Sequence, residues 1–278
     1  MLRRNKEALR KRSERIEGTT YLTNCGIDQN ENYLNNTVLP IINSSHFIND
    51  ESHEYKIVFF DLETSGFQKT ADILQIAAKC EESIFCTYVN PTQSIASKAS
   101  KITGLENITG ELFLYGKKVN SINIKAALQA FYEYLHSLSK LSILVAHNAT
   151  FDTSFFLRAV INNSMTELFK NIIIGFSDSL PLFKKFLPHR RGPAMFKLSK
   201  LAQDLLEIDT TTNFHDAQFD TNVLQKIANL IIPKNNFFMS RKLYSEAIIN
   251  EMQSQTTVTF ITSLQFLKGT ISEGMIKK

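Results

Sequence analysis

Residues 57–64 read Ile57-Val58-Phe59-Phe60-Asp61-Leu62-Glu63-Thr64, an apolar run that ends in two carboxylates two residues apart. Four apolar residues in a row before a polar turn predict a buried strand. Side chains alternate between the two faces of a strand, so Asp61 and Glu63 are expected on the same face. Bare charges are costly there, and a cation is their natural partner. The alternative is a polar turn that simply follows the strand.

Two later segments supply further acids, His147-Asn148-x-x-Phe151-Asp152 and His215-x-x-x-x-Asp220. Asp152 is expected in the first turn of a helix that follows a short strand, at the strand end where open α/β sheets bind ligands. The helix dipole favours an acid there even without a ligand.

His215 and Asp220 are five residues apart and cannot share one face of a helix. We therefore expect His215 in a loop and Asp220 on the helix that follows. The alternative for a lone histidine is a structural role.

Together these segments offer four carboxylates and one imidazole, the inventory of a metal-dependent phosphodiester nuclease. Carboxylate ligands favour Mg²⁺ or Mn²⁺, whereas zinc would call for more histidine or cysteine. Two such ions about 3.5–4 Å apart can activate a water and stabilise the leaving oxygen. A histidine with a pKa near 6.5 suits the transfer of the proton from that water.

Periodicity along the chain predicts an α/β fold with a mixed sheet, a polar tail before it and a helical extension after it. The expected divisions are a basic, disordered tail at residues 1–52, the main domain at residues 53–232 and a helical extension of unknown role at residues 233–278. Strands are expected at residues 55–60, 71–79, 84–89, 142–146 and 172–176. Helices are expected at residues 123–138, 150–162, 178–187, 197–206, 216–230 and 239–254.

Composition is that of an ordinary globular protein, with 43% hydrophobic and 21% charged residues among 278. The net charge of +4 fits a nucleic-acid partner but also many other enzymes. The first 18 residues hold seven basic and three acidic side chains, which form a nuclear-import or nucleic-acid patch or else a solvated helix. Three cysteines without a C-x-x-C pair indicate a reducing intracellular compartment, nucleus or cytoplasm. No apolar run approaches the roughly 20 residues that span a membrane, and the first residues lack a secretory signal.

The segments Phe60-Asp61-Leu62-Glu63-Thr64, His147-Asn148-Ala149-Thr150-Phe151-Asp152 and His215-Asp216-Ala217-x-x-Asp220 resemble, in this order, the three motifs of the DEDDh (DnaQ-like) exonucleases. The resemblance covers about residues 55–230. It implies a ribonuclease-H-like fold, a mixed five-stranded sheet flanked by helices. Residues 174–184 also look like the exonuclease-type domain related to some promyelocytic leukaemia protein isoforms.

The resemblance implies a 3′→5′ exonuclease that releases nucleoside 5′-monophosphates, with single-stranded 3′ ends as partners and no membrane. Asp61 would bridge two Mg²⁺ ions, for which Mn²⁺ can substitute. Glu63 and Asp220 would hold the ion that carries the attacking water, Asp152 would act near the second ion, and His215 would be the general base.

Substrate contacts are expected from residues beside the motifs and from the basic cluster around residues 184–197. The set comprises Leu62, Thr64, Leu105, Asn148, Lys184, Arg190 and Arg191. Residues 102–105 resemble the family loop that packs against the terminal nucleotide, but an ordinary helix end with a glycine cap fits them equally. The basic cluster would contact phosphates, or else be a solvated loop. Phe67 and Phe151 could approach a base, although core packing is the commoner role.

Three functions compete. DNA is favoured as substrate because the closer relatives act on it, and an RNA exonuclease or oligoribonuclease is the alternative because the same site serves both polymers. The third possibility is a non-catalytic binding or scaffold module. A degenerate module is expected to have lost an acid, and this chain has lost none.

Overall fold

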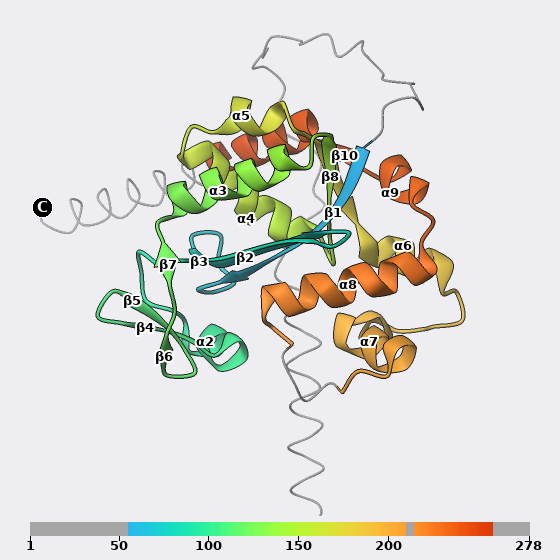
Figure 1. The fold of residues 1–278 in the computed structure, drawn as a ribbon, viewed down its shortest axis with the longest axis horizontal. Helices are drawn as coiled ribbons and strands as arrows, with labels where there is room; N and C mark the ends of the chain where they lie inside the picture. Colours follow the sequence, from blue (N-terminus) through green and yellow to red (C-terminus); the bar gives the residue numbers. More distant parts are fainter. Residues whose placement is uncertain (1–54, 210–213, 258–278) are drawn as a thin grey trace, which may run out of the picture.

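The computed structural model describes residues 55–209 and 214–257, which form a mixed sheet between two layers of helices (Figure 1). The predictions for the tail at residues 1–52 and for the last part of the extension, residues 258–278, lie outside the described residues. Within the described part, no helix combines the length and apolar character needed to cross a bilayer.

The central sheet has seven strands in the order β10-β9-β8-β1-β2-β3-β7. Its five long strands are β1 (Tyr55–Thr64), β2 (Ile73–Cys80), β3 (Ser83–Val89), β8 (Leu141–Ala146) and β9 (Ile173–Asp178). These are the five predicted strands. The sheet gains two short edge strands that were not predicted, β7 (Ser121–Ile122) and β10 (Lys242–Leu243).

Strand β1 lies at the centre of the sheet. It pairs antiparallel with β2, with Asp61 opposite Ala77, and parallel with β8, with Tyr55 opposite Leu141. Strands β2 and β3 are antiparallel, and β8 and β9 are parallel. This mixed sheet, covered by helices on both faces, confirms the predicted ribonuclease-H-like α/β fold.

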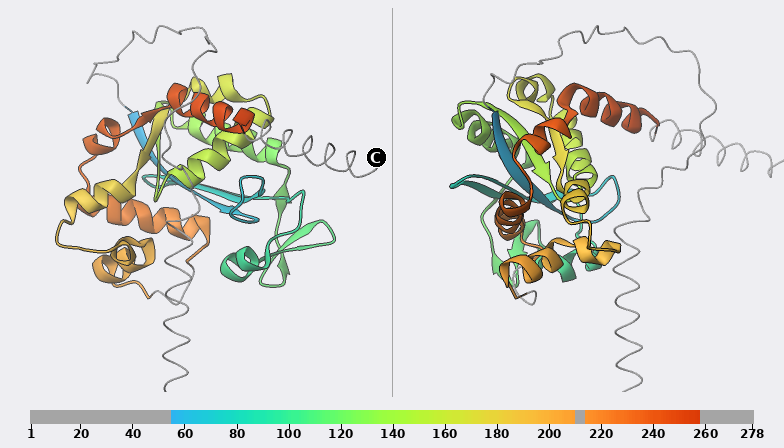
Figure 2. Two further views of the ribbon diagram at one scale, coloured as in Figure 1. Left: turned by 180° about the vertical axis from the view of Figure 1, so that it is seen from behind. Right: turned by 90° about the vertical axis from the view of Figure 1, so that its right-hand side faces the viewer.

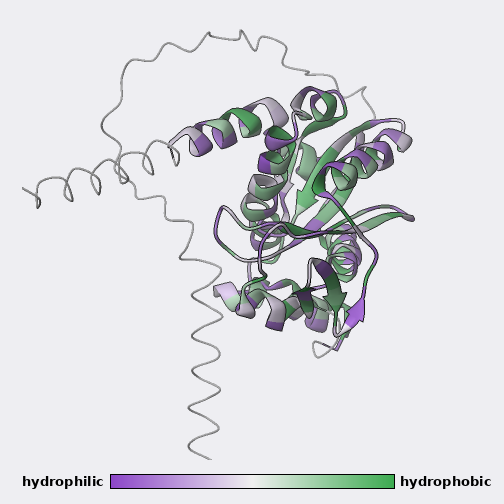
Figure 3. Cartoon of the chain, turned by 90° about the vertical axis from the view of Figure 1, so that its left-hand side faces the viewer, coloured by the Kyte–Doolittle hydropathy of each residue, from purple (hydrophilic) through white to green (hydrophobic). Residues whose placement is uncertain are grey.

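Each face of the sheet has its own apolar core. In Figure 3 much of the central sheet carries the colour of hydrophobic residues. The first core lies under α3 (Ile124–Ser137), α4 (Thr150–Asn162), α5 (Thr166–Lys170) and a helix at residues 244–257. The second lies under α6 (Ser179–Phe186), the 3₁₀ turn η1 (Pro193–Phe196), α7 (Leu198–Leu206), α8 (Ala217–Ile231) and α9 (Asn235–Met239). Figure 2 shows the two layers from behind and from the side.

The alternation of side chains along β1 determines which face of the sheet Asp61 and Glu63 occupy. Phe60 and Leu62 enter the first core, whereas Phe59 enters the second. Asp61 and Glu63 continue the row of Phe59 and therefore point toward the layer that contains α8. Burial of each phenylalanine stabilises the strand by roughly 1.5–3 kcal/mol, which holds the acids in position.

A second sheet of three strands was not predicted. It consists of β4 (Leu105–Ile108), β5 (Glu111–Leu114) and β6 (Lys117–Lys118), and it follows the short helix α2 (Ser97–Thr103). The strands are two to four residues long, too short for a clear alternation. Leu105 and Leu112 pack on Leu74 of β2 and attach this small sheet to the large one.

The prediction of one helix at residues 239–254 was wrong at its start. The structure has α9, then β10, then the helix at residues 244–257. Strand β10 pairs with β9 and runs against Gly175, where an added Cβ would lie 2.2 Å from the Lys242 carbonyl oxygen. Tyr244, Ala247 and Ile248 complete the first core, so this part of the extension is packed on the main domain.

Candidate active site

The end of β1 carries the first two acids. The pairing of β1 with β2 shifts between Glu63 and Thr64, directly after the acids. The Thr64 hydroxyl donates to the Gly66 carbonyl at 2.8 Å and so closes the turn that follows. Asp61 and Glu63 thus sit on a fixed strand end, as the sequence predicted.

Helix α8 brings in the third acid. Asp216 caps its amino end and accepts from the Phe219 N–H at 2.9 Å, which places Asp220 in the first turn. Gln75 lies opposite Glu63 on β2, and its side-chain oxygen accepts from the Ala217 N–H at 3.1 Å. Gln75 thereby ties the start of α8 to the sheet. Sequence reasoning missed this role, and the only signal was a polar amide in a mostly apolar strand.

The fourth acid, Asp152, lies in the first turn of α4, as predicted. Its Oδ1 accepts from the Leu62 N–H at 3.2 Å, which links it to β1 between Asp61 and Glu63. Asn148 has a left-handed conformation (φ 63°), and its N–H donates to Asp178 Oδ1 at 3.0 Å. The chain therefore turns sharply from β8 into α4, and Asp152 comes back toward β1.

His147 has a structural role. A carbonyl can only accept, so Nε2 donates to the Phe196 carbonyl at 2.8 Å and Nδ1 accepts from the Ser179 hydroxyl at 2.9 Å. Burial lowers the pKa of His147, which keeps the ring neutral.

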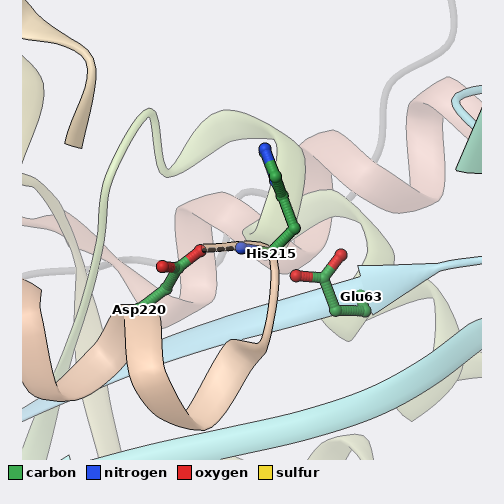
Figure 4. A group of neighbouring side chains, drawn as sticks. All are labelled: Glu63, His215 and Asp220. Atoms are coloured by element: carbon green, nitrogen blue, oxygen red, sulfur yellow. Dashed lines mark hydrogen bonds between the residues drawn. The ribbon is translucent and has the colours of Figure 1, made fainter. Parts of the chain in front are cut away.

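Glu63, His215 and Asp220 form the centre of the candidate site (Figure 4). One ligand atom from each lies within 4.8 Å of the others. His215 stands in the loop before α8 in a left-handed conformation (φ 70°), with an exposed side chain. Its backbone N–H donates to Asp220 Oδ2 at 3.1 Å. A loop histidine beside an acid on the helix is the predicted arrangement.

The pKa values of the four acids show that their carboxylates are buried close to one another. Burial, then the charges of Asp152 and Glu63, raise the pKa of Asp61 well above its ordinary value. Burial, followed by the charge of Asp220, also raises the pKa of Glu63 well above its ordinary value. Burial also raises the pKa of both Asp152 and Asp220 to about 7. The acids would hold protons near neutral pH unless a cation joined them.

The donor set fits a hard divalent cation. Asp220 Oδ1 is buried and has no hydrogen-bond partner among the described residues, so it is available as a ligand. Carboxylate oxygens are the ligands that Mg²⁺ and Mn²⁺ prefer. A cation would also offset the mutual repulsion that raises these pKa values.

Two apolar positions expected to contact substrate are buried. Leu62 lies in the first core, and Leu105 lies in the small core between the two sheets. Helix α2 ends at Gly104, which is left-handed (φ 72°) and donates its N–H to the Ser100 carbonyl. The glycine-capped helix end, one of the two alternatives for residues 102–105, is therefore the local structure.

The basic cluster divides into exposed and engaged side chains. Lys184 and Arg191 are exposed on α6 and the loop after it. Arg190 pairs with Asp204 at 2.9 Å and donates to the Met195 carbonyl at 3.0 Å, so it holds α7 against the loop.

Phe67 is 43% exposed, and the Lys98 ammonium lies 5.4 Å from its ring centre. Phe151 is partly buried against the first core.

A mixed sheet whose central strand ends in clustered acids is an arrangement that can hold the divalent ions of a metal-dependent nuclease. Residues 58–228 match the RNase_T family of exonucleases, and this match covers more than half of the chain. The protein therefore belongs to the exonuclease family, whose members are hydrolases that depend on divalent metal. The narrower resemblance of residues 174–184 to the promyelocytic leukaemia type stays a prediction.

Similar proteins include two polymerases. A DNA polymerase III of the PolC type from Clostridium perfringens (strain 13 / Type A) is 30% identical over 214 residues, 73% of this chain and 13% of that polymerase. Its counterpart from Mycoplasmopsis pulmonis (strain UAB CTIP) is 27% identical over 229 residues, 74% of this chain and 14% of the polymerase. The chain thus spans only a small part of the length of these curated relatives.

Similar solved structures include E. coli ExoI bound to single-stranded DNA, with 20% identity and a TM-score of 0.48 over 64% of this chain and 40% of that one. Exonuclease X bound to 5′ overhanging duplex DNA has 18% identity and a TM-score of 0.39 over 63% of this chain and 92% of that one.

Proposed function

We propose that this protein is a 3′→5′ exonuclease that hydrolyses nucleic acid from its 3′ end and releases nucleoside 5′-monophosphates. The observation that carries the proposal is the convergence of Glu63, Asp220 and His215 within 4.8 Å at the end of β1. Asp61 and Asp152 add their charges to the same cluster. Such a donor set can hold the divalent cations with which metal-dependent hydrolases cleave phosphodiester bonds.

Two Mg²⁺ ions are the proposed cofactors, and Mn²⁺ could substitute. Asp61, Glu63 and Asp220 would hold the first, and Asp61 and Asp152 the second. When bound, a pair of such ions supplies an activated water and stabilises the leaving oxygen. His215 would accept the proton of the attacking water, because its exposed imidazole stands beside two of the proposed ligands.

DNA is the favoured polymer because the PolC-type relatives are DNA polymerases. Lys184 and Arg191 are exposed and could contact phosphates of a single strand without reading its sequence. Thr64 and Asn148 remain proposed substrate contacts. The Thr64 hydroxyl is used within the turn. The backbone N–H of Asn148 is used by Asp178, so its half-buried side chain is the part proposed to approach the substrate.

The test is degradation of strands labelled at the 3′ or the 5′ end, with Mg²⁺ or with a chelator. The wild type should release mononucleotides from the 3′ end only with the metal, and Asp61→Asn should lose at least 100-fold in rate. Glu133→Gln is the matched control, because it removes one acid from the exposed face of α3.

Three outcomes have clear meanings. Absence of 3′ mononucleotides, or equal rates for wild type and Asp61→Asn, contradicts the proposal. Faster loss of an RNA strand than of the same DNA sequence identifies the RNA exonuclease instead. Metal-independent strand binding without cleavage points to the non-catalytic module.

A further inference from the structure

A hollow of about 470 Å³ opens directly beside His215. One wall is the amino end of α8, and the opposite wall is the end of α2 with the turn between β5 and β6. Figure 1 shows α2 and the small sheet next to that end of α8. The hollow therefore adjoins the acids, and the small sheet, which takes no part in holding them, contributes one side of it through Leu114 and Tyr115.

Tyr115 is the most exposed large apolar side chain of this hollow, with 75% of its surface open to solvent. It occupies the β5–β6 turn in a left-handed conformation (φ 48°), which is uncommon for a residue with a large side chain. Its N–H donates to the Gly104 carbonyl at 2.9 Å. An exposed aromatic side chain in such a turn adds nothing to the core.

The Tyr115 ring lies against Gly104. A Cβ added at Gly104 would lie 2.3 Å from a carbon of the ring, so the ring rests directly on the glycine backbone. The small sheet itself is anchored through Leu105 and Leu112, which are buried against Leu74. The ring thus lies against Gly104, and 75% of the Tyr115 surface is open to solvent.

The other side chains of the hollow suit a nucleotide. Phe214 and Phe219 pack edge to face at 5.1 Å on the α8 side. Lys79 of β2 is a buried residue, and its ammonium donates to Asn222 Oδ1 at 2.8 Å. The carboxylate of Asp216 is engaged by the Phe219 N–H. Aromatic surface together with a positive charge is the chemistry that binds single strands.

We propose that this hollow is a nucleotide subsite in which Tyr115 stacks on a base of the strand whose 3′ end lies at Glu63 and Asp220. The proposal rests on the function proposed above, because it takes its strand from that reaction. Every base has a π-face, so the contact tolerates any sequence. The small sheet thereby acts as a platform that increases affinity for a single strand.

The first test compares strand binding and turnover for wild type, Tyr115→Ala and Tyr115→Phe. Binding of a fluorescent single strand is measured in a chelator, and KM and kcat are measured with Mg²⁺. Loss of one stacked base should weaken binding and raise KM about 10-fold, with kcat little changed. Tyr115→Phe should restore wild-type values because it keeps the ring. Ile108→Ala is the control, as it removes another exposed apolar side chain of the same small sheet.

A second test moves the change to the substrate. An abasic position is placed in turn at each of the nucleotides nearest the 3′ end. At one position the wild type should lose about 10-fold in affinity, and Tyr115→Ala should lose nothing further. A thermal melt of each variant checks that the small sheet is folded.

The two proposals can fail separately. If wild type degrades strands but Tyr115→Ala binds and cleaves like wild type, the subsite is wrong and the exonuclease stands. Equal losses in Tyr115→Phe and Tyr115→Ala would also overturn stacking. If wild type releases no mononucleotide, the exonuclease itself is contradicted.

Discussion

At the scale of single residues, Gln75 shows how a neutral side chain can govern an acidic site. Its carbonyl oxygen accepts from the Ala217 N–H, and its amide lies 3.4 Å from Asp216 Oδ2. Both partners belong to the start of α8, one turn before Asp220. Because Gln75 is buried on β2 opposite Glu63, it sets the distance between the acid on the strand and the acid on the helix.

Replacement of Gln75 by leucine keeps a similar volume and removes both contacts with the start of α8, together with a 3.4 Å contact to Cys86 Sγ. The Ala217 N–H would be left without its side-chain partner, which should lower the free energy of unfolding by about 1–3 kcal/mol. We expect kcat to fall about 10-fold because Asp220 shifts relative to Glu63. Urea unfolding and steady-state kinetics measure the two effects. The matched control is Gln129→Leu on the exposed face of α3. Unchanged kcat in Gln75→Leu would show that the start of α8 is held by other contacts.

At the scale of elements, the edge strand β10 joins the segment after residue 232 to the sheet. Strand β9 can accept it because Gly175 has no side chain where the Lys242 carbonyl passes. The helix at residues 244–257 then follows and buries Glu251 against Arg158 of α4, with a contact of 3.3 Å. The strand and the helix together cover one edge of the first core.

Gly175→Ala should break this connection. Its Cβ would meet backbone, which cannot move away as a flexible side chain can, and overpacking of this kind costs about 1–3 kcal/mol. Denaturant unfolding should therefore shift to lower concentration, and proteolysis should cut near residue 242 first. Lys242→Ala serves as control because it shortens only an exposed side chain. If Gly175→Ala and wild type unfold at the same concentration, β10 does not contribute to stability.

Long elements were predictable from the sequence and short ones were not. The five main strands have apolar runs, and helices α3, α4 and α8 repeat apolar residues every three or four positions. Strands β4 to β7 and β10 have two to four residues, so their pairing partners decide them rather than their own sequence. Leu105 and Arg190 were expected to contact substrate, but both are engaged within the protein. Their partners, Leu74 and Asp204, are distant in the chain or on another element, so the sequence around Leu105 or Arg190 could not reveal them.

At the scale of the whole molecule, the acid cluster makes the stability of the metal-free protein depend on pH. Asp152 and Asp220 have a folded pKa of about 7, well above the value of about 4 expected in the unfolded chain. Between these values the folded state binds more protons than the unfolded state. Stability in a chelator must therefore fall as pH rises through this window.

We expect the melting temperature in a chelator to be several degrees lower at pH 8 than at pH 5.5, because each 1 kcal/mol changes it by about 2–4 °C. Mg²⁺ should reverse the loss and stabilise more at pH 8 than at pH 6, since the ligands must be deprotonated to bind. Asp220→Asn should raise the melting temperature in the chelator and reduce the response to Mg²⁺. Thermal melts at each pH, with Glu133→Gln as control, decide the matter. A melting temperature that rises with pH would contradict the assignment.

The acids come from opposite sides of the sheet: Asp152 from α4 over the first core, and Asp220 from α8 over the second. The distance between Asp152 and Asp220 therefore depends on how the two helical layers are positioned relative to each other. A large-to-small change deep in either core, far from any acid, would tilt one layer and alter the ligand geometry. We therefore expect the affinity for a divalent cation to depend on the packing of both cores. Small core defects should weaken cation binding before they lower the melting temperature.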